Sequence, residues 1–136
     1  MGLFKKAKDA LKGEEKEFLI AEHEGDGDFE YNIVGEAQNR GHLENLILKH
    51  KAKDIGEILI DALLVPEPTN AYDENAIRVL IEEKPVGYIP KNDCVEFLEI
   101  FKANNLGAMK VPARIGWDKD SAQPLIGVRL DFSWDE

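Results

Sequence analysis

The chain has 136 residues, of which 43% are hydrophobic and 32% are charged, and its formal net charge is −10. This length is that of one domain, and the composition is that of a soluble globular protein, which excludes a disordered or fibrous chain. The strong negative charge also argues against broad, nonspecific binding to nucleic acid, because such binding depends on many lysine and arginine contacts to phosphate.

Membrane and secretory segments are not expected. No apolar run approaches the roughly 20 residues that a membrane-spanning helix needs, and the N-terminus lacks the apolar stretch of a signal peptide. Cys94 is the single cysteine, so neither an intramolecular disulfide nor a multi-cysteine zinc site can form. We therefore expect a cytoplasmic protein with no membrane span, in which Cys94 is a small buried hydrophobic residue rather than a reactive thiol.

The N-terminal residues differ from the rest in charge. Four lysines stand against one aspartate in residues 1–12, and the apolar residues among them recur at helical spacing. This pattern is typical of a short amphipathic helix that contacts a membrane surface or a partner, or of a solvated tail. We expect a basic N-terminal tail or short helix and linker over residues 1–17, and the folded domain over residues 18–136.

The rest of the chain alternates short apolar runs with two amphipathic helical patterns. The helical patterns cover residues 40–51 and 92–104, and Asn92 or Asp93 is the expected N-cap of the second. Because the strands do not alternate regularly with helices, a parallel doubly wound sheet is disfavoured. The sequence predicts a mainly β protein with two helices (α+β) and a small, strongly curved antiparallel sheet or barrel. The expected strands are 18–22, 29–34, 57–65, 76–81, 86–89, 108–115 and 125–132.

Catalytic and metal-binding patterns are missing from the sequence. The acidic turn at residues 24–28 superficially resembles a calcium loop, but the later glutamate that such a loop requires is not there. The three histidines stand at no ligand spacing, and no phosphate-binding glycine loop, zinc motif or nucleophile elbow occurs. We therefore predict that the chain is not an enzyme and has no catalytic residues, no metal site and no cofactor.

The turn between the strands at 57–65 and 76–81 carries the densest set of binding groups. Asn70 can pair with a base edge or a hydroxyl, Tyr72 can offer a ring for stacking, and Asp73 can accept a hydrogen bond from a hydroxyl. The same residues suit a purely structural role, because Asn and Asp cap turns and Tyr anchors loops to a core. The residues alone leave these two interpretations balanced.

This turn and the hairpin after it resemble the HIRAN domain. The matching stretches are residues 65–79 (VPEPTNAYDENAIRV) and residues 86–91 (VGYIPK). Upstream, residues 33–36 (IVGE) match the Val-Val-Gly-Glu opening of bacterial members. The resemblance covers about residues 29 to 132, and its central motif is specific.

The resemblance implies a fold and a function. The fold is a modified OB-like, six-stranded antiparallel β-barrel with accompanying helices, found alone in bacteria and phages or fused to helicase or nuclease modules. The function is that of a noncatalytic nucleic-acid-binding module that recognises single-stranded DNA or its 3′-hydroxyl end as an accessory to DNA repair or processing. A helicase or nuclease is the partner protein that this function implies.

The resemblance also implies a set of DNA-binding residues. Asn70, Tyr72 and Asp73 would line the pocket, with Asp73 accepting a hydrogen bond from the terminal hydroxyl. Tyr88 would stack or hydrogen-bond, and Lys91 would supply a cation for phosphate. To these, we add a further candidate for a stacking ring, namely Phe132.

The chain departs from the family pattern at one place. DNA-binding eukaryotic members carry an Arg-Tyr pair after the Val-Gly opening, whereas residues 36–39 of this chain read EAQN, with Arg40 as the nearest cation. Together with the negative charge, this departure supports an alternative function. In that alternative the chain is a protein-interaction module that keeps the fold but has lost DNA-end binding.

Overall fold

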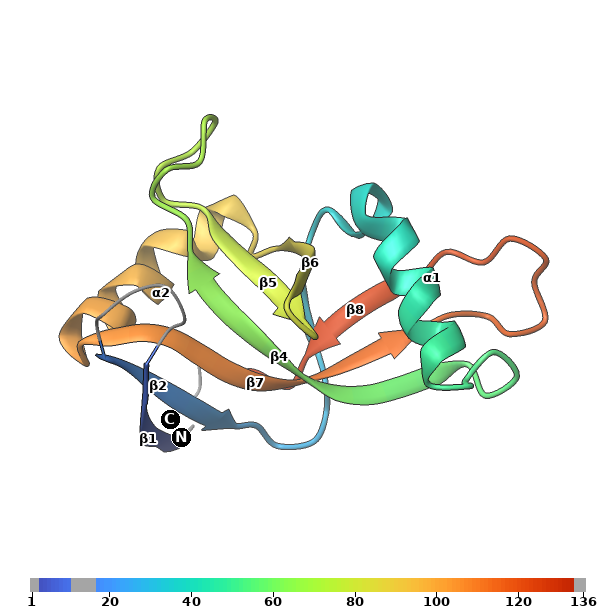
Figure 1. Ribbon diagram of the computed structural model, residues 1–136, viewed down its shortest axis with the longest axis horizontal. Coiled ribbons are helices and arrows are strands. Elements are labelled where there is room, and N and C mark those ends of the chain that lie inside the picture. The colour runs from blue at the N-terminus through green and yellow to red at the C-terminus, as the bar shows by residue number, and fades with distance from the viewer. Residues whose placement is uncertain (1–2, 11–16, 134–136) are drawn as a thin grey trace.

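The computed structural model describes residues 3–10 and 17–133 (Figure 1). In this part of the chain the strands form one strongly curved sheet, with α1 on the right and α2 on the left of the view. No helix here has the length and apolar character needed to cross a membrane. The elements are β1 (Leu3–Ala10), β2 (Glu17–Glu24), β3 (Tyr31–Asn32), η1 (Glu36–Asn39), α1 (Arg40–Lys49), β4 (Glu57–Pro66), β5 (Ile77–Ile81), β6 (Lys84–Tyr88), α2 (Lys91–Ala103), β7 (Leu106–Gly116) and β8 (Gly127–Leu130).

Six of the strands form a curled antiparallel sheet in the order β3-β8-β7-β4-β5-β6. Just after β3, Val34 forms an antiparallel bridge with Tyr88 at the end of β6. The two N–H to O distances of this bridge are 2.9 and 2.8 Å. Because β3 and β6 are the two ends of the six-strand path, the bridge joins them, and we call it the closing bridge. The predicted α+β fold with an OB-like antiparallel barrel is confirmed.

Two further strands extend the sheet. β2 pairs in parallel with the first part of β7, and β1 pairs antiparallel with β2. Residues 3–10 are therefore a strand, and the expected short helix is wrong for them. Backbone pairing with β2 has overridden the helical spacing of the apolar residues, as tertiary context often does. Residues 11–16 of the expected linker lie outside the described residues, and the boundary at residue 18 stays a prediction.

Strand β7 changes partner along one of its edges. Residues 106–110 pair with β2, whereas residues 113–116 pair with β8. Pro112 lies where the partner changes and belongs to neither ladder on that edge, so its missing N–H removes no hydrogen bond from the pairing with β2 or β8. Its carbonyl oxygen still accepts a hydrogen bond from the backbone N–H of Asp131 at 2.8 Å. This placement explains how a proline is tolerated inside the sheet.

The core lies between the inner face of the sheet and one face of each helix. Alternate residues of β5 are buried, as expected for a strand with one face on a core. The thiol residue Cys94 is only 2% exposed, so the prediction of a buried cysteine is confirmed. The helices bury residues at the spacing of a single helical face: Leu43, Leu46 and Ile47 from α1, and Cys94, Phe97 and Phe101 from α2.

Two boundaries differ from the prediction for local reasons. Helix α2 begins one residue earlier, with Pro90 at the N-cap position and no side-chain cap bond. The expected cap at Asn92 or Asp93 is therefore wrong, and the Asp93 carboxylate instead accepts a hydrogen bond from the Tyr31 hydroxyl. The strand expected at residues 29–34 is shorter because Phe29 has a φ of 51°, which is left-handed rather than extended.

Candidate functional site

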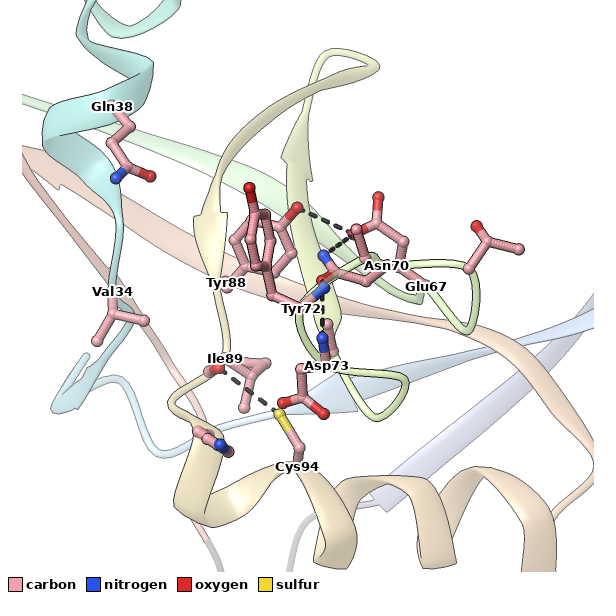
Figure 2. A pocket seen from close by; sticks show the side chains of 13 residues that line it. Val34, Gln38, Glu67, Asn70, Tyr72, Asp73, Tyr88, Ile89 and Cys94 are labelled. Atoms are coloured by element: carbon pink, nitrogen blue, oxygen red, sulfur yellow. Dashed lines mark hydrogen bonds between the residues drawn. The ribbon is translucent and has the colours of Figure 1, made fainter.

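The β4–β5 connection projects from the sheet and forms one wall of a pocket (Figures 1 and 2). The pocket has a volume of about 580 Å³. Val34 and Gln38 line it from the segment after β3, and Ile89 and Cys94 line it from the segment that enters α2. The pocket therefore lies where the closing bridge brings the two ends of the barrel together.

Five of the six predicted site residues line this pocket. Asn70, Tyr72 and Asp73 come from the β4–β5 connection, Tyr88 comes from the end of β6, and Lys91 is the first residue of α2. The β5–β6 hairpin runs out from the connection and back, which returns Tyr88 and Lys91 to its side. The fold thus gathers residues that the sequence places in two separate stretches.

Phe132 lies elsewhere. Its side chain is only 7% exposed, and its ring centroid lies 4.8 Å from that of Phe97 and 5.6 Å from that of Tyr31. A ring enclosed in this way has no free face for a base. The structure therefore assigns Phe132 to the core and removes it from the candidate ligand contacts.

Glu67 holds several residues of the pocket lining together, although the sequence analysis did not single it out (Figure 2). Its Oε1 accepts hydrogen bonds from the Asn70 amide at 2.6 Å and from the Tyr88 hydroxyl at 2.9 Å. Its Oε2 lies 3.4 Å from the Nε of Arg78. The only available signal was its position between two prolines, next to the recognised turn. We call Glu67, Asn70, Arg78 and Tyr88 the Glu67 network.

The protonation states in this network follow from these contacts. The hydrogen bond from Asn70 lowers the pKa of Glu67 most, and the Tyr88 hydrogen bond and the Arg78 charge lower it further. Burial, followed by the hydrogen bond to Glu67, raises the pKa of Tyr88. Glu67 is therefore an ionised acceptor at neutral pH, and Tyr88 is a protonated donor to it.

Asn70 also holds the turn itself. Its Oδ1 accepts hydrogen bonds from the backbone N–H groups of Tyr72 at 2.8 Å and Asp73 at 3.0 Å. With its amide nitrogen donating to Glu67 as well, most of the hydrogen-bonding capacity of this side chain is used within the protein. For Asn70, the structural role considered from the sequence is the one that the contacts favour.

Three lining residues differ from Asn70, because the ends of their side chains are available to a ligand. They are Tyr72, Asp73 and Lys91, and we call them the open wall. The Tyr72 side chain is 95% exposed, so its ring contributes almost nothing to the core. Asp73 uses Oδ1 to accept the backbone N–H of Asn75 at 2.9 Å, whereas its Oδ2 has no hydrogen-bond partner among the described residues. Lys91 is exposed at the start of α2 and forms no ion pair with the described part of the chain.

The pocket lining includes the thiol of Cys94, whose pKa is raised. Burial is the largest cause of the raised pKa of Cys94, and the nearby Asp73 charge contributes. The Cys94 Sγ lies 3.5 Å from the carbonyl oxygen of Pro90, so a protonated thiol can donate to it. No group of three or more His, Cys, Asp or Glu side chains in the described residues could hold a metal ion.

Charge in the pocket is sparse and mixed. Lys91 is the one basic side chain among the described residues that line it, and Glu67 and Asp73 supply carboxylates to the same lining. Arg40 does not reach the pocket, because its guanidinium bonds Glu44 at 2.8 Å and the Pro124 carbonyl oxygen at 2.8 Å. The lining therefore offers ring contacts and hydrogen-bonding groups more than positive charge.

Comparison with known protein families identifies the domain. The HIRAN domain family model matches residues 26–112, which are 87 of the 136 residues and include the whole pocket. Strands β1, β2 and β8 lie outside the matched region. Neither the curated proteins nor the solved structures that were compared include a match. The chain belongs to the HIRAN domain family, a family of nucleic-acid-binding modules.

Proposed function

We propose that this chain binds the 3′-hydroxyl end of single-stranded DNA in the pocket, without catalysing a reaction, as an accessory to a helicase or nuclease in DNA repair or processing. The observation that carries the proposal is the open wall. An almost fully exposed tyrosine ring stands beside a carboxylate oxygen with no hydrogen-bond partner in the described chain and a lysine without an ion pair there. A stacking surface, a hydroxyl acceptor and a phosphate contact are what a strand end needs.

Tyr72 supplies the stacking surface. Burying a large aromatic ring is favourable, and a ring left in water forgoes that free energy. The Tyr72 ring, 95% exposed on an ordered turn, is therefore suited to contact with another molecule. The turn is held by the two backbone hydrogen bonds to Asn70, so the backbone that carries Tyr72 is ordered before a ligand arrives. Stacking of a base on an aromatic side chain contributes about 1–3 kcal/mol.

Asp73 supplies the selectivity for a hydroxyl end. Its Oδ2 can accept a hydrogen bond from a 3′-hydroxyl, whereas a 3′-phosphate would bring negative charge next to Asp73 and Glu67. Lys91 can contact the phosphate that precedes the last nucleotide, and the N-terminal end of α2 adds a favourable partial charge there. The arrangement therefore favours a strand end without a terminal phosphate.

The test compares two ends and two carboxylate variants. Fluorescence anisotropy at fixed salt would measure binding of a 5′-labelled dT8 that ends in either a 3′-hydroxyl or a 3′-phosphate. We expect wild type to prefer the hydroxyl end about tenfold, a preference equivalent to one charged hydrogen bond. Asp73→Asn keeps Oδ1 for the Asn75 N–H but removes the charge, and it should abolish the preference.

Glu74→Gln is the matched control. Glu74 is exposed on the same connection and does not line the pocket, so its substitution changes net charge by the same amount. The preference for the hydroxyl end should survive in this variant. Equal binding of the two ends by wild type would contradict end recognition.

A second function, as a protein-interaction module, is favoured by a different surface. A pocket of about 290 Å³ lies between α1 and the β7–β8 connection, and Leu48 on its rim is 66% exposed. This function predicts no binding of any oligonucleotide. It also predicts that Leu48→Asp weakens binding of a purified helicase or nuclease partner, whereas Tyr72→Ala does not.

A further inference from the structure

A row of polar side chains leads away from the pocket across β3, β8 and β7. Asn32 of β3 pairs with Arg129 of β8, and Arg129 pairs with Arg114 of β7. Val34 lies two residues after Asn32, so both point to the same face of the sheet, and Val34 lines the pocket. The row therefore begins at the pocket wall and continues over the outer face of the barrel.

Arg129 is exposed and unpaired within the described part of the chain, where no carboxylate lies within ion-pair distance of its guanidinium. Arg114, its neighbour, is held in place from two sides. The Nε of Arg114 lies 3.3 Å from Glu57, and its guanidinium carbon lies 5.1 Å from the centre of the Phe29 ring. The row thus presents one free cation beside a second cation stacked on an aromatic ring.

Phe29 is held at this surface in a strained conformation. Its φ of 51° is uncommon for a bulky residue. The buried Asp131 carboxylate accepts the backbone N–H of Gly27 at 3.0 Å and that of Phe29 at 3.4 Å, which fixes the turn. Gly25 allows this approach, because a Cβ there would lie 2.2 Å from the Asp131 carbonyl oxygen. The core contact that holds the turn therefore sets where the ring lies.

We propose that this row, Asn32, Arg129, Arg114 and Phe29, binds the nucleotides that precede the strand end held in the pocket. Its chemistry is that of a single-strand path: guanidinium groups for phosphate, an amide for a sugar or base edge, and a stacked ring. The inference rests on the proposed function for the position of the 3′ end. The row itself requires only a single strand.

The dimensions of the row suit a short strand. Asn32, Arg129 and Arg114 lie on three neighbouring strands, so they span about 10 Å at roughly 4.8 Å between strands. Sites on OB-type folds take about four or more nucleotides. We therefore expect the pocket and the row together to hold a longer strand than the pocket alone.

A length series tests the row separately from the pocket. Binding of dT2, dT4 and dT8 with free 3′-hydroxyl ends would be followed by the chemical shifts of the ¹⁵N-labelled full chain. Wild-type affinity should rise with length. Arg129→Gln should leave dT2 binding unchanged, weaken dT8 binding about tenfold, and lower the slope of log affinity against log salt by about 0.7. Lys119→Gln, an equal charge change on the β7–β8 connection, should behave as wild type.

The outcomes separate the two proposals. If dT2 binds by its hydroxyl end and longer strands bind no tighter, or if Arg129→Gln shows the wild-type length dependence, the row is refuted and the pocket stands. If dT8 binds equally with either end but loses affinity in Arg129→Gln, the row stands and end recognition is refuted. Arg114→Gln gives a second check on the row, with circular dichroism to confirm that the variant folds.

Discussion

The two walls of the pocket carry neighbouring residues with opposite roles. In the Glu67 network, the polar groups of Glu67, Asn70 and Tyr88 are used by one another. On the open wall, Tyr72 is 95% exposed, and the Oδ2 of Asp73 has no hydrogen-bond partner among the described residues. One motif therefore supplies residues of both kinds. Some belong to the Glu67 network, which holds the site together and which we also call its frame, and others are free to contact a ligand. Removing a residue of the frame should therefore affect folding, whereas removing a contact should affect binding.

The largest effect should come from breaking the frame at Glu67. Glu67→Ala removes the acceptor of Asn70 and Tyr88 and the partner of Arg78, and we expect it to lower the free energy of unfolding by about 2 kcal/mol. Urea denaturation followed by circular dichroism would measure this loss. Glu74→Ala, which removes a neighbouring exposed carboxylate without such partners, should change the free energy by less than about 0.5 kcal/mol.

The next effect should come from the open wall at Tyr72. Tyr72→Ala should weaken binding of dT8 tenfold or more, since stacking contributes about 1–3 kcal/mol per base. Its stability should match that of wild type within about 0.5 kcal/mol, because the ring is almost fully exposed. Tyr72→Phe keeps the ring and should retain binding. A Tyr72→Ala chain that unfolds more easily than wild type would place Tyr72 in the frame instead.

The smallest effect is the pH dependence of the frame. Because the folded pKa of Glu67 lies below its usual value of 4.5, its stabilisation is fully present above that pH. The stabilisation is lost as the pH falls through the lowered folded pKa. Wild type should therefore be more stable than Glu67→Gln at pH 7, and the difference should shrink as the pH falls below about 4.5. Urea midpoints of both chains between pH 3 and 7 would show whether it does.

Local patterns predicted much of the fold. Alternating apolar residues located β5, and helical spacing located α1 and most of α2. The closing bridge and the parallel pairing of β2 with β7 could not be predicted, because each joins residues far apart in the chain without a local signal. The N-terminal strand shows the same limit, since its pairing with β2 decides its conformation.

The sequence predicted which residues line the site but not what each of them does there. The motif located five residues of one pocket, yet it could not show that the Asn70 carbonyl oxygen is used by two backbone N–H groups. Phe132 has the composition of a stacking residue, and only the packing of Phe97 and Tyr31 around it reveals a core residue. Glu67 was missed because a carboxylate between prolines carries no signal of its partners.

The closing bridge has a consequence for how binding and unfolding are related. Among the described residues it is the only ladder contact between β3 and β6, and its two residues, Val34 and Tyr88, both line the pocket. A contact this small is the place where a barrel opens most readily. A molecule that contacts both residues would hold the two strand ends together, and its binding free energy would add to the stability of the closed form. Opening at this edge would separate two residues that line the pocket, so we expect binding and closure of the barrel to be coupled.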